Sequence, residues 1–455
     1  MVSVIETFDD SVLGPEGHST AHLGSPLFGL VGSPGTRLFA GPTRSMGPET
    51  FADHERRLGV LDLDRCTPQA LRETVRASGL RGRGGAGFPS ATKLEVAAAS
   101  PGTPIVVVNA SEGEPASRKD RTLLELRPHL ILDGACVAAT AVGASEIIVY
   151  SHRAHQRANA SLERALGERR DAGRDIVPIR VIDAPDRYVA GETSAVVSYL
   201  SGTGALPRRG AQPAARVGIA NRPTVVNNAE TLAHLALIAR FGPTWFTRVG
   251  PPEAPGSTLI TLAGSVAVPG LVVELLGPVT IGDVLQSVGG LDTVPRAVLL
   301  GGYAGNWISG EAAWRTPLER HRLDALGLSL GCGLVAVLNE DDCGLVQTAR
   351  LLRWMAGQSS GQCGPCVFGL PVLAQLVDDI TTGKSRRVDL RRLRVHAASI
   401  RGRGACGHPT GAVNLVESAL ETFGPELAMH LRGEVCDTLD GPTSFPLPPG
   451  TGEGL

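Results

Sequence analysis

The chain has 455 residues, which is enough for about three domains, and its 43 basic and 45 acidic side chains leave a net charge of −2, so nucleic acid is not an expected partner. The longest apolar stretch, residues 134–145, is much shorter than the ~20 residues of a membrane-spanning helix, and we expect no direct membrane insertion. The acidic N-terminus does not resemble a secretory signal and the eight cysteines are sparse, so the sequence predicts a cytoplasmic protein.

The first 65 residues are rich in glycine and proline and predict an N-terminal extension that wraps over a larger domain. A helix is predicted over 67–80, where Thr67 fits the N-cap and Pro68 fits the first turn. Beyond it, short β-branched runs alternate with helical patterns, which is typical of parallel strands joined by crossover helices. The predicted strands are 105–108, 147–150 and 177–182, and the predicted helices are 121–143, 153–168 and 229–240.

The pattern changes at Ser257, where valine and leucine runs broken by glycine and proline predict a small β-rich module to about Trp307. After Asp342 the character is helical and predicts a compact bundle, followed by a flexible tail. The bundle helices are expected at 344–357, 364–383, 387–400 and 408–432. The expected domains are an extension (1–65), a nucleotide-binding domain (66–250), the β module (251–335), the bundle (336–434) and the tail (435–455).

The loop after the first helix reads Gly82-Arg83-Gly84-Gly85-Ala86-Gly87 and satisfies the pattern G-x-G-x-x-G. In a dinucleotide-binding unit this motif follows a strand and opens a helix, whereas here it follows a helix and is expected to precede a strand. Consecutive glycines still let backbone N–H groups approach an anion, and Lys93 is the natural phosphate partner in a chain with only three lysines. The alternative is a merely flexible loop.

Three further motifs place polar side chains near the predicted sheet. Asn109, Glu112 and Glu114 follow the first strand, at the carboxyl edge where α/β sheets bind ligands. The other two motifs are Tyr188-Val-Ala-Gly191-Glu192-Thr193-Ser194 and Pro223-Thr-Val-Val-Asn227-Asn228-Ala-Glu230. Taken singly, each motif is also explained by turns and helix caps.

Cysteines gather near the C-terminus in Cys363-Gly-Pro-Cys366, with Cys406 forty positions further on. A thioredoxin-like site would need a preceding strand, whereas helical sequence lies on both sides here. With Cys406 and His408, a zinc site of three cysteines and one histidine is one alternative. An iron–sulfur cluster is the other, since it also takes soft thiolates at this spacing.

Taken together in order and spacing, these motifs resemble the NADH-oxidising F-type subunit of respiratory complex I. The same family includes the diaphorase subunits of NAD-linked hydrogenases and formate dehydrogenases. The resemblance covers about residues 60–432 and is carried by SGLRGRGGAGFPSATK (78–93), NASEGEPASRKDR (109–121), GETSA (191–195), RPTVVNNAETL (222–232) and GQCGPC (361–366).

The resemblance implies an α/β fold with a Rossmann-like FMN domain, a ubiquitin-like β-grasp (SLBB) module and a helical bundle with the iron–sulfur motif. It also implies that FMN takes a hydride from NADH and that electrons leave through the cluster, toward a thioredoxin-like [2Fe–2S] subunit of a larger redox complex. The cofactor carries this chemistry, so no catalytic acid or base is required, although Glu112 and Glu192 are expected nearby. The implied cofactor-binding residues are Gly82, Arg83, Gly84, Gly85, Gly87, Phe88, Lys93, Asn109, Glu112, Glu114, Tyr188, Gly191, Glu192, Asn227 and Asn228.

The sequence departs from the family pattern at the metal motif. Ser360 stands where the family has the first cysteine, so Cys363, Cys366 and Cys406 are the remaining thiol ligands. The expected outcomes are a serine-ligated [4Fe–4S] cluster, a [3Fe–4S] cluster, a cluster with a ligand from elsewhere, or none. Cys343 and His408 are the candidate substitutes, and the other four cysteines, Cys66, Cys136, Cys332 and Cys436, are expected to be small buried side chains.

The nucleotide side also departs from the pattern. Ser111 replaces an acid, Thr193 replaces the second glutamate, and Val96 and Gln212 fall where aromatic walls are expected, while Phe88 keeps one such wall and Arg209 takes a basic position. The leading hypothesis is therefore an FMN-dependent electron-transfer subunit with weakened NADH binding. The alternatives are a non-catalytic relative that keeps the fold for protein assembly, and a zinc-stabilised form of the same fold.

Overall fold

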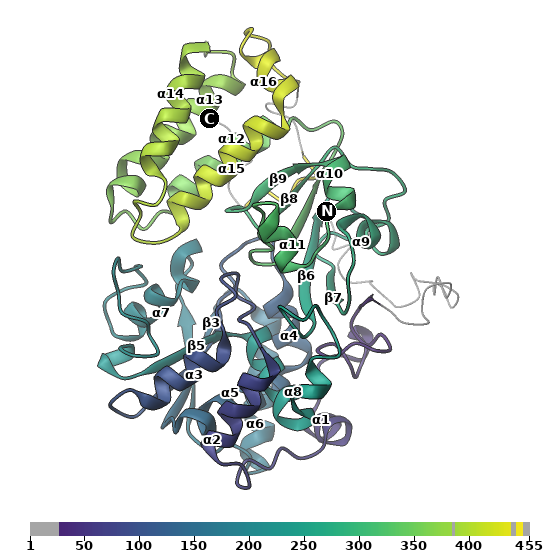
Figure 1. Ribbon diagram of the computed structural model, residues 1–455, viewed down its shortest axis with the longest axis vertical. Helices are drawn as coiled ribbons and strands as arrows, with labels where there is room; N and C mark the ends of the chain where they lie inside the picture. The colour runs from purple at the N-terminus through teal and green to yellow at the C-terminus, as the bar shows by residue number, and fades with distance from the viewer. Residues whose placement is uncertain (1–26, 385–386, 438–442, 449–455) are drawn as a thin grey trace.

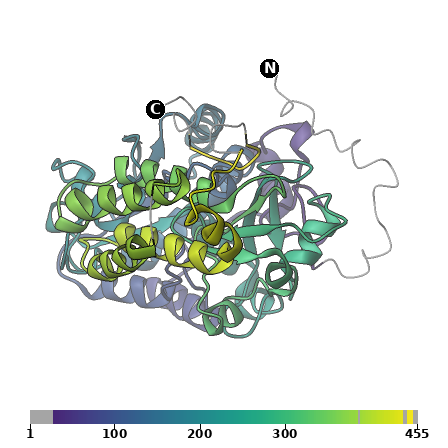
Figure 2. The ribbon, with the colours of Figure 1, turned by 90° about the horizontal axis from the view of Figure 1, so that it is seen from above.

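The computed structural model describes residues 27–384, 387–437 and 443–448, which form three packed modules (Figure 1). A parallel sheet with its helices occupies the lower half of the view, and a mixed sheet and a helical bundle lie above it. Figure 2, seen from above, shows the bundle and the mixed sheet side by side over the first module. No helix within these ranges is long and apolar enough to cross a membrane.

The first module is a four-stranded parallel sheet buried on both faces, in the order β4-β3-β2-β5. Side chains alternate between the two faces, so Val106 and Val108 enter the core beneath most of the helices while Ile105 and Val107 enter a smaller core against α7. The strands are β2 (Ile105–Ala110), β3 (Glu146–His152), β4 (Ile179–Ala184) and β5 (Thr224–Asn228). The helices are α2 (Pro68–Ser78), α3 (Ser90–Ala99), α4 (Lys119–Leu126), α5 (Pro128–Val142), α6 (Gln156–Asp171), α7 (Thr193–Leu200) and α8 (Ala229–Phe246).

Parallel strands with crossover helices are confirmed, with two differences in detail. The region predicted as one helix over 121–143 is two, because Pro128 cannot continue α4 and instead begins α5. The expectation that the glycine loop precedes a strand is wrong, since α3 begins at Ser90 and the strand follows only afterwards. The alanine-rich sequence of α3 suits a helix and carries no capping signal that would have marked its start.

The second module is a mixed sheet in the order β1-β7-β6-β10-β8-β9. The hairpin of β6 and β7 leads into α9, and the last strand, β10, returns to the centre parallel to β6, as expected of a β-grasp module. β10 runs to Leu338, three residues beyond the predicted end of the module. Its elements are β6 (Thr258–Gly264), β7 (Val272–Leu275), α9 (Ile281–Ser287), β8 (Ala297–Leu300), β9 (Asn306–Ser309), α10 (Gly310–Arg315), α11 (Arg320–Ala325) and β10 (Leu334–Leu338).

The described part of the N-terminal extension packs against the parallel-sheet module and adds a strand to the mixed sheet. β1 (Phe28–Gly29) adds an edge strand to the mixed sheet, and α1 (Phe51–Leu58) packs against α5 and α6. The buried carboxylate of Glu274 accepts hydrogen bonds from the backbone N–H groups of residues 37–39, at 3.0 to 3.1 Å. The extension is therefore anchored in the core, with Leu38 and Phe39 fully buried.

The third module is the predicted helical bundle. It comprises α12 (Gly344–Gly357), a π-helical turn (Pro365–Gly369), α13 (Leu370–Thr381), α14 (Arg387–Ile400), α15 (His408–Thr422) and α16 (Gly424–His430). The described part of the predicted flexible tail packs against the protein instead. Phe445 is buried beside Trp307, and the Thr443 hydroxyl donates a hydrogen bond to Asp342.

Candidate functional site

A cavity of about 690 Å³ lies at the carboxyl ends of β2 and β5, where the strand order reverses. Parallel α/β sheets bind ligands at such a switch point, because the loops from neighbouring strands diverge there. All three modules contribute to this switch-point cavity, as Asn109, Gly331 and Cys406 illustrate. It gathers ten of the predicted site residues, namely Gly84, Gly85, Asn109, Glu112, Glu114, Tyr188, Gly191, Glu192, Asn228 and Cys406.

The glycine loop forms one wall of the cavity through Gly84, Gly85 and Ala86. Gly85 has a φ of +102°, which a side chain would strain. Arg320 of α11 holds the loop from behind, donating to the carbonyl oxygens of Gly85 at 3.4 Å and Ala86 at 3.1 Å. Among the described residues, no acceptor meets the N–H groups of Gly84, Gly85 and Ala86, so these donors are available to an anion.

Asn109 holds the loop that carries Gly191. Its amide nitrogen donates to the Gly191 carbonyl at 2.8 Å, and its amide oxygen accepts from the Ser111 hydroxyl at 2.8 Å. A Cβ on Gly191 would come within 2.7 Å of the Ser111 hydroxyl, so the position has no room for a side chain. Ser111, which departs from the family pattern, thus helps to fix the cavity wall.

Glu112 and Glu192 line the cavity, but their carboxylates cap helices. Glu112 accepts from the backbone N–H groups of Asp120 and Arg121 at the start of α4, both at 3.0 Å. Glu192 accepts from those of Ser194 and Ala195 at the start of α7, at 2.9 and 3.0 Å. These contacts support the interpretation of the two glutamates as helix caps. Both residues also line the cavity.

Glu114 is a buried carboxyl on the cavity wall. Its Oε2 accepts from the backbone N–H of Tyr303 at 2.9 Å and from the Tyr188 hydroxyl at 3.2 Å, while Oε1 is buried without a partner. Burial raises the pKa of Glu114 to about 7. This carboxyl can therefore hold or release a proton near neutral pH.

The cavity wall includes a buried network of charges that the sequence patterns did not reveal. Lys119 donates to Glu230 at 2.7 Å and to Asp120 at 3.1 Å. The Asp120 carboxylate in turn accepts from the side-chain amide of Asn228 at 3.0 Å. Although burial opposes it, the charges of Asp120 and Glu230 raise the pKa of Lys119, so the amine stays protonated. The scarcity of lysine in the chain was the one signal that could have drawn attention to it.

Six of the predicted cofactor-binding residues are not on the cavity wall. Lys93 donates to the carbonyl of Val226 at 2.7 Å and to the side chain of Asn227 at 2.8 Å, and burial lowers its pKa to about 8. Phe88 is half exposed beside the loop. The remaining members of this set are Gly82, Arg83, Gly87 and Asn227.

The predicted metal ligands meet at the edge of the bundle. Although burial opposes it, backbone hydrogen bonds from Ala405 and Cys366 lower the pKa of Cys363. Burial and the neighbouring charge of Cys363 raise the pKa of Cys366 to about 11. Burial likewise raises the pKa of Cys406, and the Cys363 charge acts in the same direction, so the three thiols lie close enough to influence one another. The Ser360 hydroxyl is buried and has no hydrogen-bond partner among the described residues.

Two family models match this chain, one over the parallel-sheet module and one over the helical bundle. Residues 75–237 match the Nuo51 FMN-binding domain, and residues 346–430 match the NADH-ubiquinone oxidoreductase-F iron-sulfur binding region. The chain is 32% identical to the F 2 subunit of the NADH-quinone oxidoreductase of Rhizobium meliloti over 383 residues, covering 81% of this chain and 90% of that protein. The chain belongs to the family of F-type subunits of NADH-quinone oxidoreductases. The F-type subunit of the Streptomyces coelicolor enzyme is also 32% identical, over 85% of this chain and 89% of that protein.

A solved structure supports the fold of this family. A chain of the NAD⁺-reducing [NiFe]-hydrogenase in its H2-reduced state superposes with a TM-score of 0.74 and 32% identity over 80% of this chain. The match spans 63% of the hydrogenase chain. The predicted fold class and the predicted oxidoreductase family are both confirmed.

The residues present fit the cofactors of an F-type subunit. The switch-point cavity has the size of a small-molecule site, free backbone donors on one wall and an unpartnered Glu114 oxygen on another. At the bundle, Cys366 and Cys406 both lie near enough to Cys363 to feel its charge, with Ser360 beside Cys366, and soft thiolates are the ligands that iron–sulfur clusters take. Cys406 belongs to both places, since it lines the cavity and interacts with Cys363.

His408 and the cysteines outside the metal motif lie at several separate places in the structure. His408 lines the cavity and its Nε2 lies 2.8 Å from the carbonyl of Met355. Cys136 is buried as expected. Cys66, Cys332 and Cys436 pack against hydrophobic cores but are only partly buried, so the expectation of small buried side chains holds in part for them, and Cys332 also lines the cavity. Cys343, a candidate substitute ligand for the cluster, lies with Cys436 beside His430 and not with Cys363.

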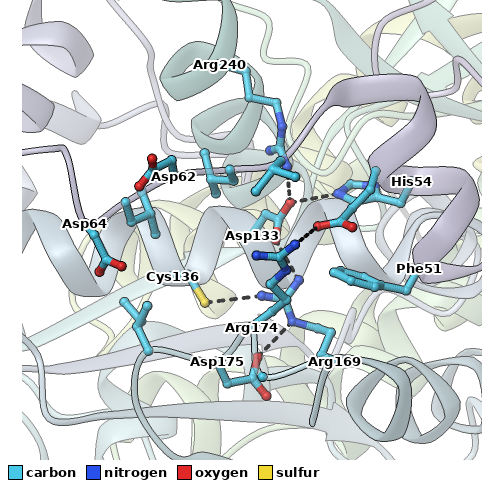
Figure 3. A pocket seen from close by; sticks show the side chains of 16 residues that line it. Phe51, His54, Asp62, Asp64, Asp133, Cys136, Arg169, Arg174, Asp175 and Arg240 are labelled. Atoms are coloured by element: carbon cyan, nitrogen blue, oxygen red, sulfur yellow. Dashed lines mark hydrogen bonds and ion pairs between the residues drawn. The ribbon is translucent and has the colours of Figure 1, made fainter. Parts of the chain in front are cut away.

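A second cavity, of about 600 Å³, lies in the first module beneath α1 (Figure 3). Asp133 stands at its centre and receives hydrogen bonds from Arg169 at 2.6 Å and from Arg240 at 2.5 Å, and its carboxylate lies 2.7 Å from His54 Nε2. Although burial opposes it, the bonds to His54 and Arg169 hold the pKa of Asp133 far below its usual value. This arrangement is a structural ion network.

Proposed function

We propose that this chain oxidises NADH with FMN bound in the switch-point cavity and passes the electrons to an iron–sulfur cluster held by the bundle. The observation that carries the proposal is the position of Cys406, which lines the cavity and also interacts with Cys363 of the metal motif. FMN, when bound, accepts two electrons as a hydride and releases them singly. The protein then has to hold cofactor, donor and cluster at one place.

We assign the FMN phosphate to the free N–H groups of Gly84, Gly85 and Ala86, in a loop that Arg320 fixes from behind. Asn109 and Asn228 present amides from adjacent strand ends, each already oriented by a partner. Lys93 stays a predicted phosphate partner, but its amine lies off the cavity wall and donates to the carbonyl of Val226 in β5. Glu114 holds a proton at the cavity wall near neutral pH.

For the cluster we assign Cys363, Cys366 and Cys406 as thiolate ligands and Ser360 as the fourth residue at the site. Its hydroxyl is buried, and it lies close enough to Cys366 to lower the pKa of that thiol, against the larger effect of burial. A serine hydroxyl ligates cluster iron less readily than a cysteine thiol does, because it loses its proton far less easily and is a harder ligand. The same site in a [3Fe–4S] form would leave Ser360 unligated.

We propose that the chain works in the cytoplasm as one subunit of a larger redox complex. The relatives are named as subunits, and the eight cysteines of this chain are free, as is typical of a reducing compartment. Two exposed apolar side chains, Val367 and Phe368, directly follow Cys366. They support contact with a partner beside the cluster, for which a thioredoxin-like [2Fe–2S] subunit is the predicted class.

Cofactor analysis tests the proposal. The full chain, purified anaerobically after growth with added riboflavin and iron, is expected to carry about one FMN per chain and to contain iron. Colourless, iron-free protein would favour the alternative of a non-catalytic relative retained for assembly. Zinc in place of iron at Cys363 and Cys366 would favour the zinc-stabilised form.

A further inference from the structure

A second group of metal-ligating side chains lies in the bundle, apart from the proposed cluster. Cys343 Sγ is 3.4 Å and Cys436 Sγ is 3.2 Å from His430 Nε2, and all three ligand atoms lie within 4.8 Å of one another. Cys343 is the residue before α12, His430 ends α16, and Cys436 follows in the next loop. His430 is fully buried and Cys343 is nearly so.

His430 is oriented as a metal ligand would be. Its Nδ1 lies 3.1 Å from the backbone carbonyl of Glu434, and a carbonyl only accepts, so Nδ1 carries the hydrogen. The lone pair is then on Nε2, which faces both thiols. Metal-binding histidines are commonly fixed in this way by a backbone carbonyl on the other ring nitrogen.

Hydrogen bonding accounts for only one of the two short contacts to His430. The single Nε2 lone pair accepts from one thiol only, although both sulfur atoms lie within 3.4 Å of it. A disulfide between the two cysteines would leave Nε2 without a donor. One cation satisfies all three atoms at once.

We propose that Cys343, His430 and Cys436 bind one divalent cation of the zinc class. Ordinary zinc–sulfur and zinc–nitrogen bonds at tetrahedral angles place sulfur and nitrogen about 3.6 Å apart, close to the two separations observed. Loss of both thiol protons gives two thiolates, whose charges balance a divalent cation. Among the described residues no fourth histidine, cysteine or carboxylate joins the group, so water is the expected fourth ligand.

The site is separate from the cluster and has a structural role. The 14 residues of α12 put about 20 Å between Cys343 and the loop that holds Ser360. The cation would tie the start of α12 to the chain after α16. Next to Cys343, Asp342 accepts a hydrogen bond of 2.7 Å from the Thr443 hydroxyl, which fastens residues 443–448 to the start of α12.

Metal analysis of paired variants tests the proposal. Zinc and iron are measured per chain after dialysis against a chelator, in the full chain and in C436S, C366S and C66S. We expect about one zinc in the wild type, at least a tenfold loss in C436S with iron and flavin unchanged, and loss of iron but not zinc in C366S. C66S changes an unrelated, partly exposed thiol and should match the wild type.

Three results would overturn the site: wild-type protein without zinc after growth in zinc-supplemented medium, zinc that follows Cys366 instead of Cys436, or a Cys343–Cys436 disulfide found by mass spectrometry. If C436S does not fold, the wild type decides the matter. Loading with Co²⁺ should produce the near-ultraviolet band of a cobalt–thiolate bond in the wild type and in C366S, and a much weaker band in C436S, which keeps all three cluster thiols. Absence of that band would equally overturn the proposal.

Discussion

Asn109 and Asn228 are paired residues on the adjacent parallel strands β2 and β5. Each ends its strand region at the switch point, and each has its amide oriented by a different partner, the Gly191 carbonyl for Asn109 and the Asp120 carboxylate for Asn228. The pair therefore presents fixed polar groups on the cavity wall, where Asn228 lies next to Gly84 of the glycine loop. We expect cofactor binding to depend on that arrangement.

Adding one methyl group at Gly84 should weaken FMN binding without unfolding the protein. A Cβ there meets nothing closer than 3.9 Å, at Asn228, but it stands on the wall that we assign to phosphate. We expect FMN affinity to fall at least ~10-fold in G84A, about 1.4 kcal/mol, with thermal stability unchanged. The control is G167A, a helical glycine in open space, which should leave FMN affinity as it is. Unchanged affinity in G84A would show that the loop does not bind the cofactor.

Glu114 should make stability depend on pH. Its folded-state pKa of about 7 lies above the ordinary value, so its contribution is present in acid and is lost as the pH rises toward and through 7. Denaturation at about pH 5 and about pH 8 should show the wild type losing up to ~3 kcal/mol relative to E114Q over that interval. E163Q, on an exposed position of α6, should follow the wild type. Parallel profiles for E114Q and wild type would contradict the assignment.

Restoring a thiol at Ser360 should strengthen the cluster. The buried hydroxyl without a partner lies beside Cys366, so a cysteine there adds a soft ligand where a hard one stands. We expect iron in S360C to approach about four per chain and to resist chelation better than in the wild type. The neighbouring variant S359C controls for an extra thiol at the same loop. No gain in iron for S360C would argue against a cluster at this site.

The ion network at Asp133 should be a major source of stability. In D133N, Arg169 and Arg240 stay buried without their shared carboxylate, and we expect a loss of about 3 kcal/mol in the free energy of unfolding. Since the folded-state pKa of Asp133 is held low, the wild type should lose this advantage as the pH falls below the ordinary range of aspartate titration. D186N, at a side chain that is 95% exposed, should cost less than ~0.5 kcal/mol. Equal stability of the two variants would contradict this account.

Much of the fold could be predicted from the sequence because its strands are β-branched runs and its bundle helices have clear apolar faces. The helix α3 was missed because nothing in its sequence marks a start. The strand β1 was missed for a different reason, since two residues have no periodicity and depend on pairing with β7. The predicted helix over 121–143 is divided at Pro128, because proline has no backbone N–H to continue the hydrogen bonds of α4.

The site could be predicted in part for similar reasons. Asn109 and Asn228 follow predicted strands, so topology brings them together. Arg320 was not predicted, because 233 positions separate it from Gly87 and only the fold places them in contact. The same holds for Cys343 and His430, which share no local motif.

Whether the chain oxidises NADH is decided by anaerobic titration of the purified protein, with flavin and cluster bound, against NADH. We expect the flavin absorbance near ~450 nm to bleach and the signal of the reduced cluster then to appear. This expectation would be contradicted by protein in which dithionite reduces both groups while NADH reduces neither.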